Sequence, residues 1–423
     1  MFAKIASLFS PTNKDLRKRI YFTLFALAIF ILGSNITLPW AKVITEELGF
    51  FELFNLMSGG GLQQFSIFAL GVSPYITASI ITQLLQMDII PYFKELKEQG
   101  YTGRQKINKI TRYLGIIMAL VQGYVIAINY LGTNDVLTIL KTTVTLTGGT
   151  AFLLWLGDQI TQKGIGNGLS LLIMAGIIKS IPSMFVTAFQ SFVTAGTYAP
   201  WLGWTLFVAF ALVYILIIVG IIWIQLAERR IPIQYANRTN SAYGGQQTFL
   251  PIKLNSAGVI PVIFSSTIIS IPATIVSFLE NQTGIAFVNK WINMDTPTGM
   301  ILYVLLIFFF GYFYTFMQMN PEEMSKNLNK SGGYIPGVRP GTDTSSYISN
   351  VLSKLTVVGT LFLIVIAVIP ILFSKFSGLP SSVTLGGTGL LIVVGVAIET
   401  YKQIESSLVS RSYKRSQKRI WKT

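Results

Sequence analysis

The chain has 423 residues, of which 52% are hydrophobic and only 12% are charged, and its mean hydropathy is +0.59. The charged fraction is about half of the roughly 25% typical of soluble proteins, which excludes an ordinary soluble domain. The chain has no cysteine and no histidine, which excludes disulfide and thiol chemistry. The usual general base and the commonest metal ligand are therefore missing, so the composition argues against an enzyme and predicts no cofactor and no metal site.

Apolar stretches of roughly membrane-spanning length recur along the chain and predict an all-α polytopic membrane protein. The chain order gives about ten spans: residues 20–40, 67–90, 113–131, 143–160, 168–185, 202–226, 257–278, 300–316, 355–373 and 385–398. The first stretch follows basic residues, as a signal peptide does. Its length and the absence of a small-residue cleavage site favour a retained membrane helix.

Basic residues are concentrated in every second gap between these spans. The rich gaps are residues 1–19, 91–112, the short gap at Lys163, 227–253, 318–354 and 402–422. The remaining gaps hold only Lys42, Lys141, Lys179, Lys290 and Lys375. Because cations resist translocation, the rich side is predicted to be cytoplasmic, with both termini inside and an even number of spans. The net charge of +15 also suits anionic lipids or an acidic or RNA-containing partner.

The spans divide into two predicted halves. The first half covers residues 1–185 with spans one to five, and an outer connection covers 186–203. The second half covers 204–403 with spans six to ten and the cytoplasmic loops 227–253 and 318–354, and a basic tail covers 404–423. Because five is odd, the halves enter the membrane with opposite orientation, which predicts an inverted repeat around a central pore or site.

Three classes of protein fit such an architecture. A secondary transporter is favoured by inverted halves, but it usually places an ionisable group in mid-membrane, and the carboxylates here lie at the ends of spans or in outer gaps. A membrane-embedded enzyme is opposed by the lack of histidine and cysteine. A passive channel needs neither feature.

An unusual segment precedes the second span. Phe50, Phe54, Met57, Gly61 and Phe65 are spaced as one face of a helix. The segment 49–65 is too short to cross a bilayer and is interrupted by Ser58 and the glycines that follow. It is interpreted either as an interfacial helix on the outer surface or as a short mobile segment in an outer vestibule.

Two further stretches stand out for their spacing. The Gly-Ile-Gly-Asn-Gly run at residues 164–168 matches neither the dinucleotide nor the P-loop fingerprint, so it predicts a tight re-entry turn between spans four and five. The loop 334–341 contains Pro336 and Pro340 and presents Arg339 between them. A single rigidly mounted guanidinium suits docking of a partner.

Five of these stretches together resemble the SecY family, the central subunit of the bacterial protein-conducting channel. They are residues 66–85, 154–173, 255–261, 334–341 and 386–392. They occur in the family's order, and the resemblance runs over essentially the whole chain. It implies a channel that translocates unfolded secretory polypeptides across the bacterial cytoplasmic membrane and releases membrane segments laterally into it.

The resemblance also implies a pore closed at its waist by aliphatic side chains and sealed from outside by a plug. The ring maps to Ile76, Ile80, Ile173, Ile263 and Ile392, with Ile177 as a candidate sixth member. The plug segment (residues 50–65) includes Phe54, Met57, Gly59, Gly60 and Gly61. An apolar constriction tends to dewet, so a small ion must shed its water without gaining a replacement ligand.

Lateral opening and docking surfaces are implied in the same way. The candidate lateral gate comprises Thr82, Gln83, Gln122, Ser265, Ser266 and Thr267, where polar pairs across helices would be weak, about 0.6 to 2 kcal/mol. The candidate docking residues for a cytoplasmic partner are Arg339, Arg229, Arg230 and Arg238. The implied partners are the subunits SecE and SecG, the SecA motor ATPase or the ribosome, signal peptides and translocating chains.

Overall fold

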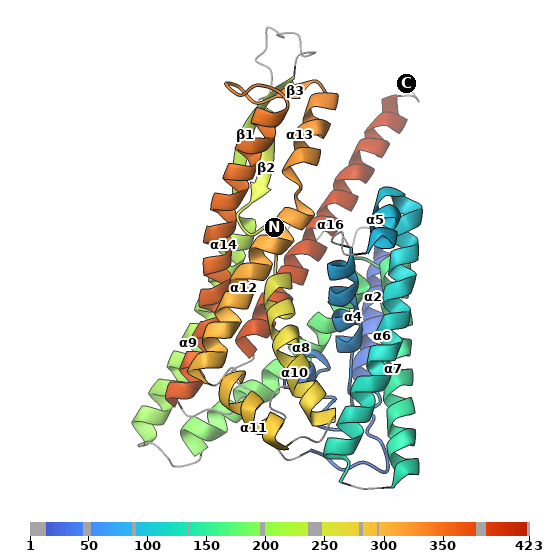
Figure 1. Cartoon of the computed structure of the whole chain (residues 1–423), viewed down its shortest axis with the longest axis vertical. Coiled ribbons are helices and arrows are strands. Elements are labelled where there is room, and N and C mark those ends of the chain that lie inside the picture. The colour runs from blue at the N-terminus through green and yellow to red at the C-terminus, as the bar shows by residue number, and fades with distance from the viewer. Residues whose placement is uncertain are drawn as a thin grey trace. The chain divides into compact units, whose positions relative to one another are not determined.

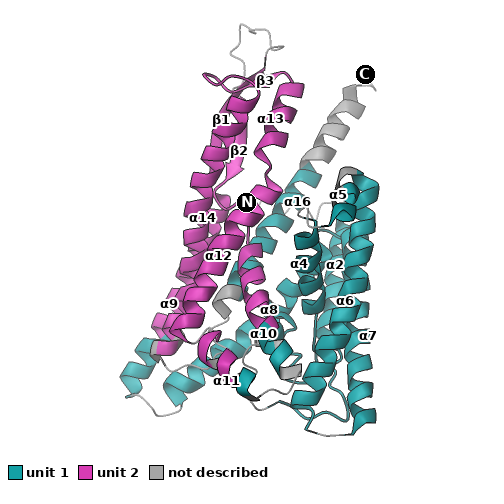
Figure 2. Ribbon diagram, in the orientation of Figure 1, with its two compact units in different colours: residues 1–207, 272–285, 379–423 teal, residues 208–271, 286–378 magenta. Residues whose placement is uncertain are grey.

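A computed structural model describes residues 14–44, 52–86, 90–132, 135–194, 199–235, 248–278, 282–293, 296–377 and 386–420 (Figure 1). The chain forms two compact units (Figure 2). Unit 1 comprises Met1–Phe207, Pro272–Ile285 and Leu379–Thr423, and unit 2 comprises Val208–Ile271 and Ala286–Gly378. The last predicted span therefore belongs to the same unit as the first five, so these units do not coincide with the predicted halves, which remain a prediction.

Unit 1 is built mainly from helices (Figure 1). They are α2 (Lys14–Gly33), α3 (Glu52–Met57), α4 (Ser73–Leu85), α5 (Pro91–Glu98), α6 (Tyr101–Tyr130), α7 (Val136–Lys163), α8 (Gly168–Phe189), which a π-helical turn at Gln190–Thr194 extends, and α16 (Gly386–Ile420). Helix α6 packs between α4 and α7, α8 packs against α7 and α16, and α2 contacts both α7 and α8. Apolar residues form helices here because a helix satisfies its own backbone polar groups in lipid.

Side-chain caps fix where α7 and α8 begin. The Asp135 carboxylate accepts hydrogen bonds from the backbone N–H groups of Leu137 and Thr138, and the hydrogen bond from the Thr138 hydroxyl holds the pKa of Asp135 below its usual value. The Asn167 side chain accepts from the N–H groups of Leu169 and Ser170 at the start of α8. These bonds satisfy donors that have no partner within the helix.

The predicted re-entry turn is confirmed, because α7 ends at Lys163 and α8 begins at Gly168. A methyl group added at Gly168 would clash with the carbonyl oxygen of Gly157. The glycine therefore allows the two helices to approach closely just after the turn.

Unit 2 combines apolar helices with a small sheet. It contains most of α9 (Pro200–Leu226) and α10 (Ile260–Phe278), part of α11 (Gln282–Trp291), and all of α12 (Pro297–Gln318), α13 (Pro321–Lys330) and α14 (Thr342–Ser377). The strands are β1 (Glu228–Tyr235), β2 (Thr248–Lys253) and β3 (Gly333–Tyr334), arranged antiparallel in the order β2-β1-β3. The all-α prediction is wrong in this respect, because two predicted cytoplasmic loops pair as strands.

The ten predicted spans each overlap a helix of the structure, with shifted ends. Among the described residues, six helices are long and apolar enough to cross a membrane: Tyr101–Tyr130, Val136–Lys163, Gly168–Thr194, Pro200–Leu226, Pro297–Lys330 and Thr342–Phe373. The second predicted span becomes α-helical only at Ser73, after a series of turns, with Pro74 in the first helical turn. The count of ten spans and the cytoplasmic placement of both termini remain predictions.

Candidate functional site

The plug segment folds into a short helix followed by a tight turn. Helix α3 ends at Met57, and Gly59 and Gly60 then adopt φ angles of +72° and +77°, which L-residues with side chains rarely adopt. The helix thus ends where the sequence predicts an interruption, at Ser58 and the glycines that follow, so the helical face does not continue to Phe65. Phe50 lies outside the described residues. The glycines form a left-handed turn rather than a helix.

Asn55 closes this segment on itself. Its backbone carbonyl accepts from the Gly60 N–H at 2.8 Å, and its side-chain oxygen accepts from the Gln63 N–H at 3.0 Å. The Ser58 hydroxyl donates to the same Asn55 carbonyl at 3.0 Å. Asn55 is only 4% exposed, so these bonds are shielded from solvent. The segment from α3 to Gln63 is thus a hydrogen-bonded unit.

The end of this unit and the residues after it are attached to the chain that follows α2. The Ile44 N–H donates to the Gln63 carbonyl at 2.8 Å. The Leu38 N–H donates to the Phe65 carbonyl at 2.9 Å, and the Ile67 N–H donates to the Ile36 carbonyl at 3.0 Å. Phe65 and Leu62 are fully buried in a hydrophobic cluster that also contains Leu38. This part of the segment is therefore firmly held, and α3 itself contacts α8 and α16.

Four of the predicted ring isoleucines lie in unit 1, and Ile263 lies in unit 2, on α10. Ile80 on α4, Ile173 on α8 and Ile392 on α16 are 2%, 7% and 4% exposed. Ile76 and Ile263 are half-buried. Ile177, the candidate sixth member, lies against α16, because a methyl group at Gly389 would be 2.9 Å from its Cγ2 atom. The convergence of the five on one axis remains a prediction.

The hydroxyls of the candidate lateral gate are bonded within their own helices. Thr82 donates to the Ala78 carbonyl at 2.8 Å, Ser265 to that of Pro261 at 2.7 Å, and Thr267 to that of Ile263 at 2.8 Å. Ser266 also donates to the Ile263 carbonyl, at 2.9 Å. Each of these hydroxyls thus has a partner in its own helix. Their weak pairing across helices, and the lateral gate itself, remain predictions.

The two glutamines of the candidate gate differ from the hydroxyls. Gln83 donates from Nε2 to the Ser79 hydroxyl at 3.1 Å, within α4. The side-chain oxygens of Gln83 and Gln122 are buried and have no hydrogen-bond partner among the residues that the structure describes. Helices α4 and α6, which carry them, pack against each other. A buried oxygen without a hydrogen bond costs free energy, so Gln83 and Gln122 destabilise the packing of α4 against α6.

The predicted docking arginines lie in a part of unit 2 that has its own small core. Buried residues from β1, β2, α14 and the loop 334–341 pack together: Ile231, Ile252, Ile335, Ile348 and Leu352. Arg229 and Arg230 are exposed on β1, and Arg230 forms an ion pair with Glu228 at 2.8 Å. Arg238 lies outside the described residues.

The backbone of the loop 334–341 is held at several points. The Thr344 hydroxyl donates to the Arg339 carbonyl at 2.8 Å, and the Ser325 hydroxyl donates to the Gly341 carbonyl at 2.8 Å. Ile335 is 3% exposed and anchors the loop in the core of unit 2. The Arg339 side chain itself is exposed and forms no ion pair with any residue that the structure describes.

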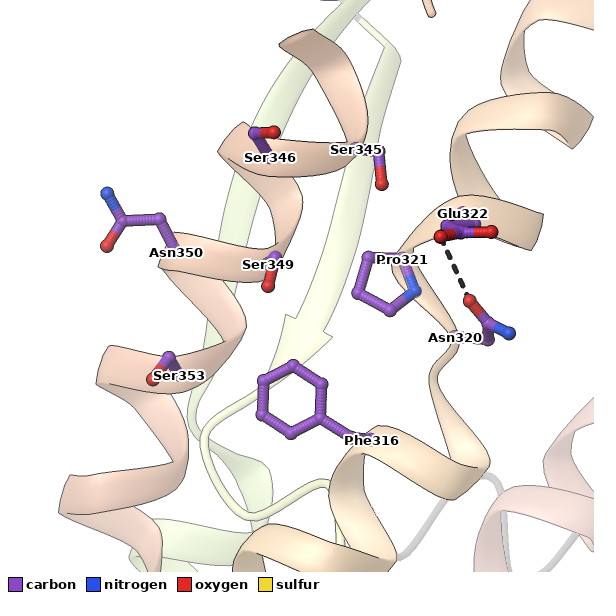
Figure 3. A pocket seen from close by; sticks show the side chains of 9 residues that line it. All are labelled: Phe316, Asn320, Pro321, Glu322, Ser345, Ser346, Ser349, Asn350 and Ser353. Atoms are coloured by element: carbon purple, nitrogen blue, oxygen red, sulfur yellow. Dashed lines mark hydrogen bonds between the residues drawn. The ribbon is translucent and has the colours of Figure 1, made fainter. Parts of the chain in front are cut away.

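Sequence reasoning missed a polar pocket of about 600 Å³ in unit 2 (Figure 3). Its lining residues come from the end of α12, the start of α13 and one side of α14: Phe316, Asn320, Pro321, Glu322, Ser345, Ser346, Ser349, Asn350 and Ser353. The Asn320 side chain accepts from the Glu322 N–H at 3.0 Å and caps α13. The signal in the sequence was the helical spacing of Ser345, Ser349 and Ser353. Hydroxyls and one carboxylate suit a polar or cationic group.

These observations define the class of the protein as a multi-pass helical membrane protein. A protein-family model described as SecY matches residues 66–401. The protein translocase subunit SecY of Staphylococcus epidermidis is 47% identical over 417 residues, covering 95% of this chain and 97% of that protein. The subunit of the same name from Bacillus subtilis is 47% identical over 418 residues, covering 95% and 96%. The chain belongs to the SecY family.

Solved structures show the same fold. A protein-conducting channel superimposes with a TM-score of 0.70 at 20% identity, covering 93% of both chains. Sec61 in a canine ribosome–channel complex superimposes with a TM-score of 0.66 at 20% identity and the same coverage. A third structure, from a study of the plug domain of SecY and the closed state of the channel, gives a TM-score of 0.66 at 19% identity, again covering 93% of both chains.

Proposed function

We propose that this chain is the channel subunit of a protein translocase. It passes unfolded secretory polypeptides across the bacterial cytoplasmic membrane and releases membrane segments sideways into the lipid. The observation that carries this proposal is its 47% identity to translocase subunits over 95% of its length. The absence of histidine and cysteine agrees with a passive conduit, in which the energy for movement comes from a partner.

The proposed constriction consists of Ile76, Ile80, Ile173, Ile263 and Ile392. An isoleucine side chain offers no hydrogen bond, so passing chains of any sequence do not adhere to it. A small ion entering an apolar ring loses its hydration without compensation, whereas an extended polypeptide fills the gap. The burial of Ile80, Ile173 and Ile392 supports this assignment, because a lipid-facing position in the same helices is far more exposed, as Ile178 is at 46%.

The proposed lateral gate uses hydroxyls that are already satisfied. Thr82, Ser265 and Thr267 each bond a carbonyl of their own helix, so a signal peptide displaces packing rather than hydrogen bonds when it separates the helices. The unsatisfied oxygens of Gln83 and Gln122 gain partners if a polar backbone or water reaches them.

The proposed docking surface is the cytoplasmic part of unit 2 and contains Arg339 on the loop 334–341. It also contains Arg229 and Arg230 on β1, the strand that pairs with β3 at the start of that loop. SecA or the ribosome binds there, SecE and SecG complete the channel complex, and anionic lipids contact the basic loops. Among the fold relatives, Sec61 was solved in a ribosome–channel complex, which supports a ribosome as one partner. Both termini lie on the cytoplasmic side.

The ring assignment is tested by Ile80→Asn and Ile392→Asn, with Ile178→Asn as the matched control on a lipid-facing site. An amide at the waist holds water, so we expect a severalfold rise in ion conductance across planar bilayers and export of substrates with defective signal sequences. The control introduces the same side chain and should leave both readouts unchanged. Wild-type conductance and wild-type signal stringency in both ring variants would refute the ring.

A further inference from the structure

Helix α8 and the plug segment approach each other most closely at Gly176. A methyl group at Gly176 would clash with the carbonyl oxygen of Met57 and would lie 3.1 Å from the backbone nitrogen of Gly59. From the other side, a methyl group at Gly59 would lie 3.3 Å from the Cα atom of Gly176. The two backbones therefore touch with no side chain between them, and any larger residue at position 176 must displace the segment.

Two neighbours of Gly176 on the same helix add to this contact. The Ser180 hydroxyl lies 3.4 Å from the carbonyl oxygen of Leu56, at the last turn of α3, and 3.3 Å from the carbonyl oxygen of Gly176. The Lys179 side chain passes beside the glycine turn, with its Cδ atom 2.9 Å from a methyl group placed at Gly59. Gly176, Lys179 and Ser180 thus surround the end of α3.

The ammonium group of Lys179 is bound to the end of α2. It donates to the Ser34 hydroxyl at 2.9 Å and to the Ser34 carbonyl at 3.3 Å. A lysine within an apolar helix is costly and needs partners of this kind. Lys179 therefore joins three elements. It belongs to α8, the aliphatic part of its side chain lies beside the plug segment, and its ammonium group is hydrogen-bonded to Ser34 at the end of α2.

We propose that Gly176, Lys179 and Ser180 form the seat that holds the plug closed, and that Lys179 is the residue that positions it. This rests on the proposed role of residues 50–65 as the plug. The seat is shallow: it offers close backbone contact, one long hydrogen bond and the stem of a lysine. The part from α3 to Gly61 is bonded internally through Asn55, so it leaves the seat together. Gln63, whose carbonyl accepts from the Ile44 N–H at 2.8 Å, and Phe65 remain attached to the chain after α2.

Substitutions distinguish a role of these residues in holding the plug from a role in stability alone. Gly176→Ala should unseat the plug, with a severalfold rise in bilayer conductance and relaxed signal stringency. Gly148→Ala on α7, where nothing lies within 4 Å of the added methyl group, is the matched control and should behave as wild type.

Lys179→Met retains the stem and loses the bonds to Ser34, whereas Lys179→Ala loses both, so we expect more leak from Lys179→Ala than from Lys179→Met. If Lys179 only capped α2, both would lower thermal stability equally and leave conductance unchanged.

A disulfide gives a test that does not depend on leak. The chain has no cysteine, so Leu56→Cys combined with Ser180→Cys introduces one pair. In the assembled complex, we expect oxidation to form an intramolecular cross-link and to stop export, and reduction to restore it. Failure to cross-link would refute the seat. Cross-linking with normal export would show that export does not require the plug to leave α8, and the proposed gating role of the seat would be wrong. The ring would be unaffected by that result, because Ile80→Asn tests it separately.

Discussion

Arg339 combines an exposed side chain with a backbone that is fixed from both sides. Hydrogen bonds from Thr344 and Ser325 hold the carbonyls of Arg339 and Gly341, and Ile335 is buried below. A side chain presented by a rigid loop loses little conformational freedom when a partner binds it. In contrast, Arg230 already pairs with Glu228, so a partner must compete for it.

Arg339→Glu should therefore weaken docking without disturbing the fold. Reversing the charge places a carboxylate against a surface that accepts a cation, and we expect at least a severalfold loss in SecA or ribosome affinity, measured by binding to reconstituted vesicles. Arg339→Lys should recover only part of the affinity if the contact is bidentate. Lys141→Glu, the same charge change in a predicted outer gap, is the control. Unchanged affinity in Arg339→Glu would mean that the positive charge of the loop sets only the orientation of the chain in the membrane.

At the level of single residues, the sequence indicated which residues are candidates for function but not which atoms they contact. The two prolines of the loop 334–341 predicted that Arg339 is presented at a fixed place, and the loop backbone is held by hydrogen bonds from Thr344 and Ser325. The role of Arg339 in docking remains a prediction. The bonding of Thr82, Ser265 and Thr267 to their own helices was not predicted, because a hydroxyl's choice between its own helix and a neighbour depends on local packing. The contact between Gly176 and Gly59 was also missed, because nothing in the sequence brings the two segments together.

Among the elements, α7 shows how two adjacent glycines can have opposite surroundings. A methyl group at Gly149 would clash with the Ile67 carbonyl oxygen, whereas at Gly148 nothing lies within 4 Å. Gly149 is buried and Gly148 is exposed. The buried glycine thus lets the turns before α4 approach the backbone of α7.

Gly149→Ala is expected to lower the free energy of unfolding by about 1–3 kcal/mol, the usual cost of overpacking. Gly148→Ala makes the same chemical change and should be neutral, since the added methyl group meets no neighbour. Thermal unfolding of both purified variants in the same detergent compares them directly. Equal stability of the two variants would mean that the turns at residue 67 do not pack on α7 as the structure has them.

The ends of elements were harder to predict than their existence. Long apolar runs identified α6, α7, α9 and α14 because lipid leaves no alternative to a helix. The start of α4 at Ser73 and the end of α3 at Met57 depend on turns with positive φ angles and on burial against other elements. The sheet was missed because its strands lie in basic loops. The signal in the sequence was the apolar residue at every second position, Ile231 and Ile233, and both are buried in β1.

For the whole molecule, charge and hydropathy predicted a multi-pass membrane protein, and family membership agrees with that class. The two compact units were not predicted, because α16 joins the first spans through its packing on α8, a contact between residues far apart in sequence. Within unit 1, Ile80, Ile173 and Ile392 come from three different helices and are all buried. We propose that these residues and Ile263 contact the polypeptide as it crosses the membrane.

Site-specific photo-cross-linking to a stalled secretory chain tests that claim most directly. A photoreactive residue is placed in turn at Ile80, Ile173, Ile263 and Ile392, with Ile178 and Val144, which are 46% and 61% exposed, as controls. We predict that the four ring positions cross-link to the stalled chain and that the two controls cross-link to lipid only. Cross-links from the controls to the stalled secretory chain, or lipid adducts alone from the ring positions, would show that these isoleucines do not line the path of the polypeptide.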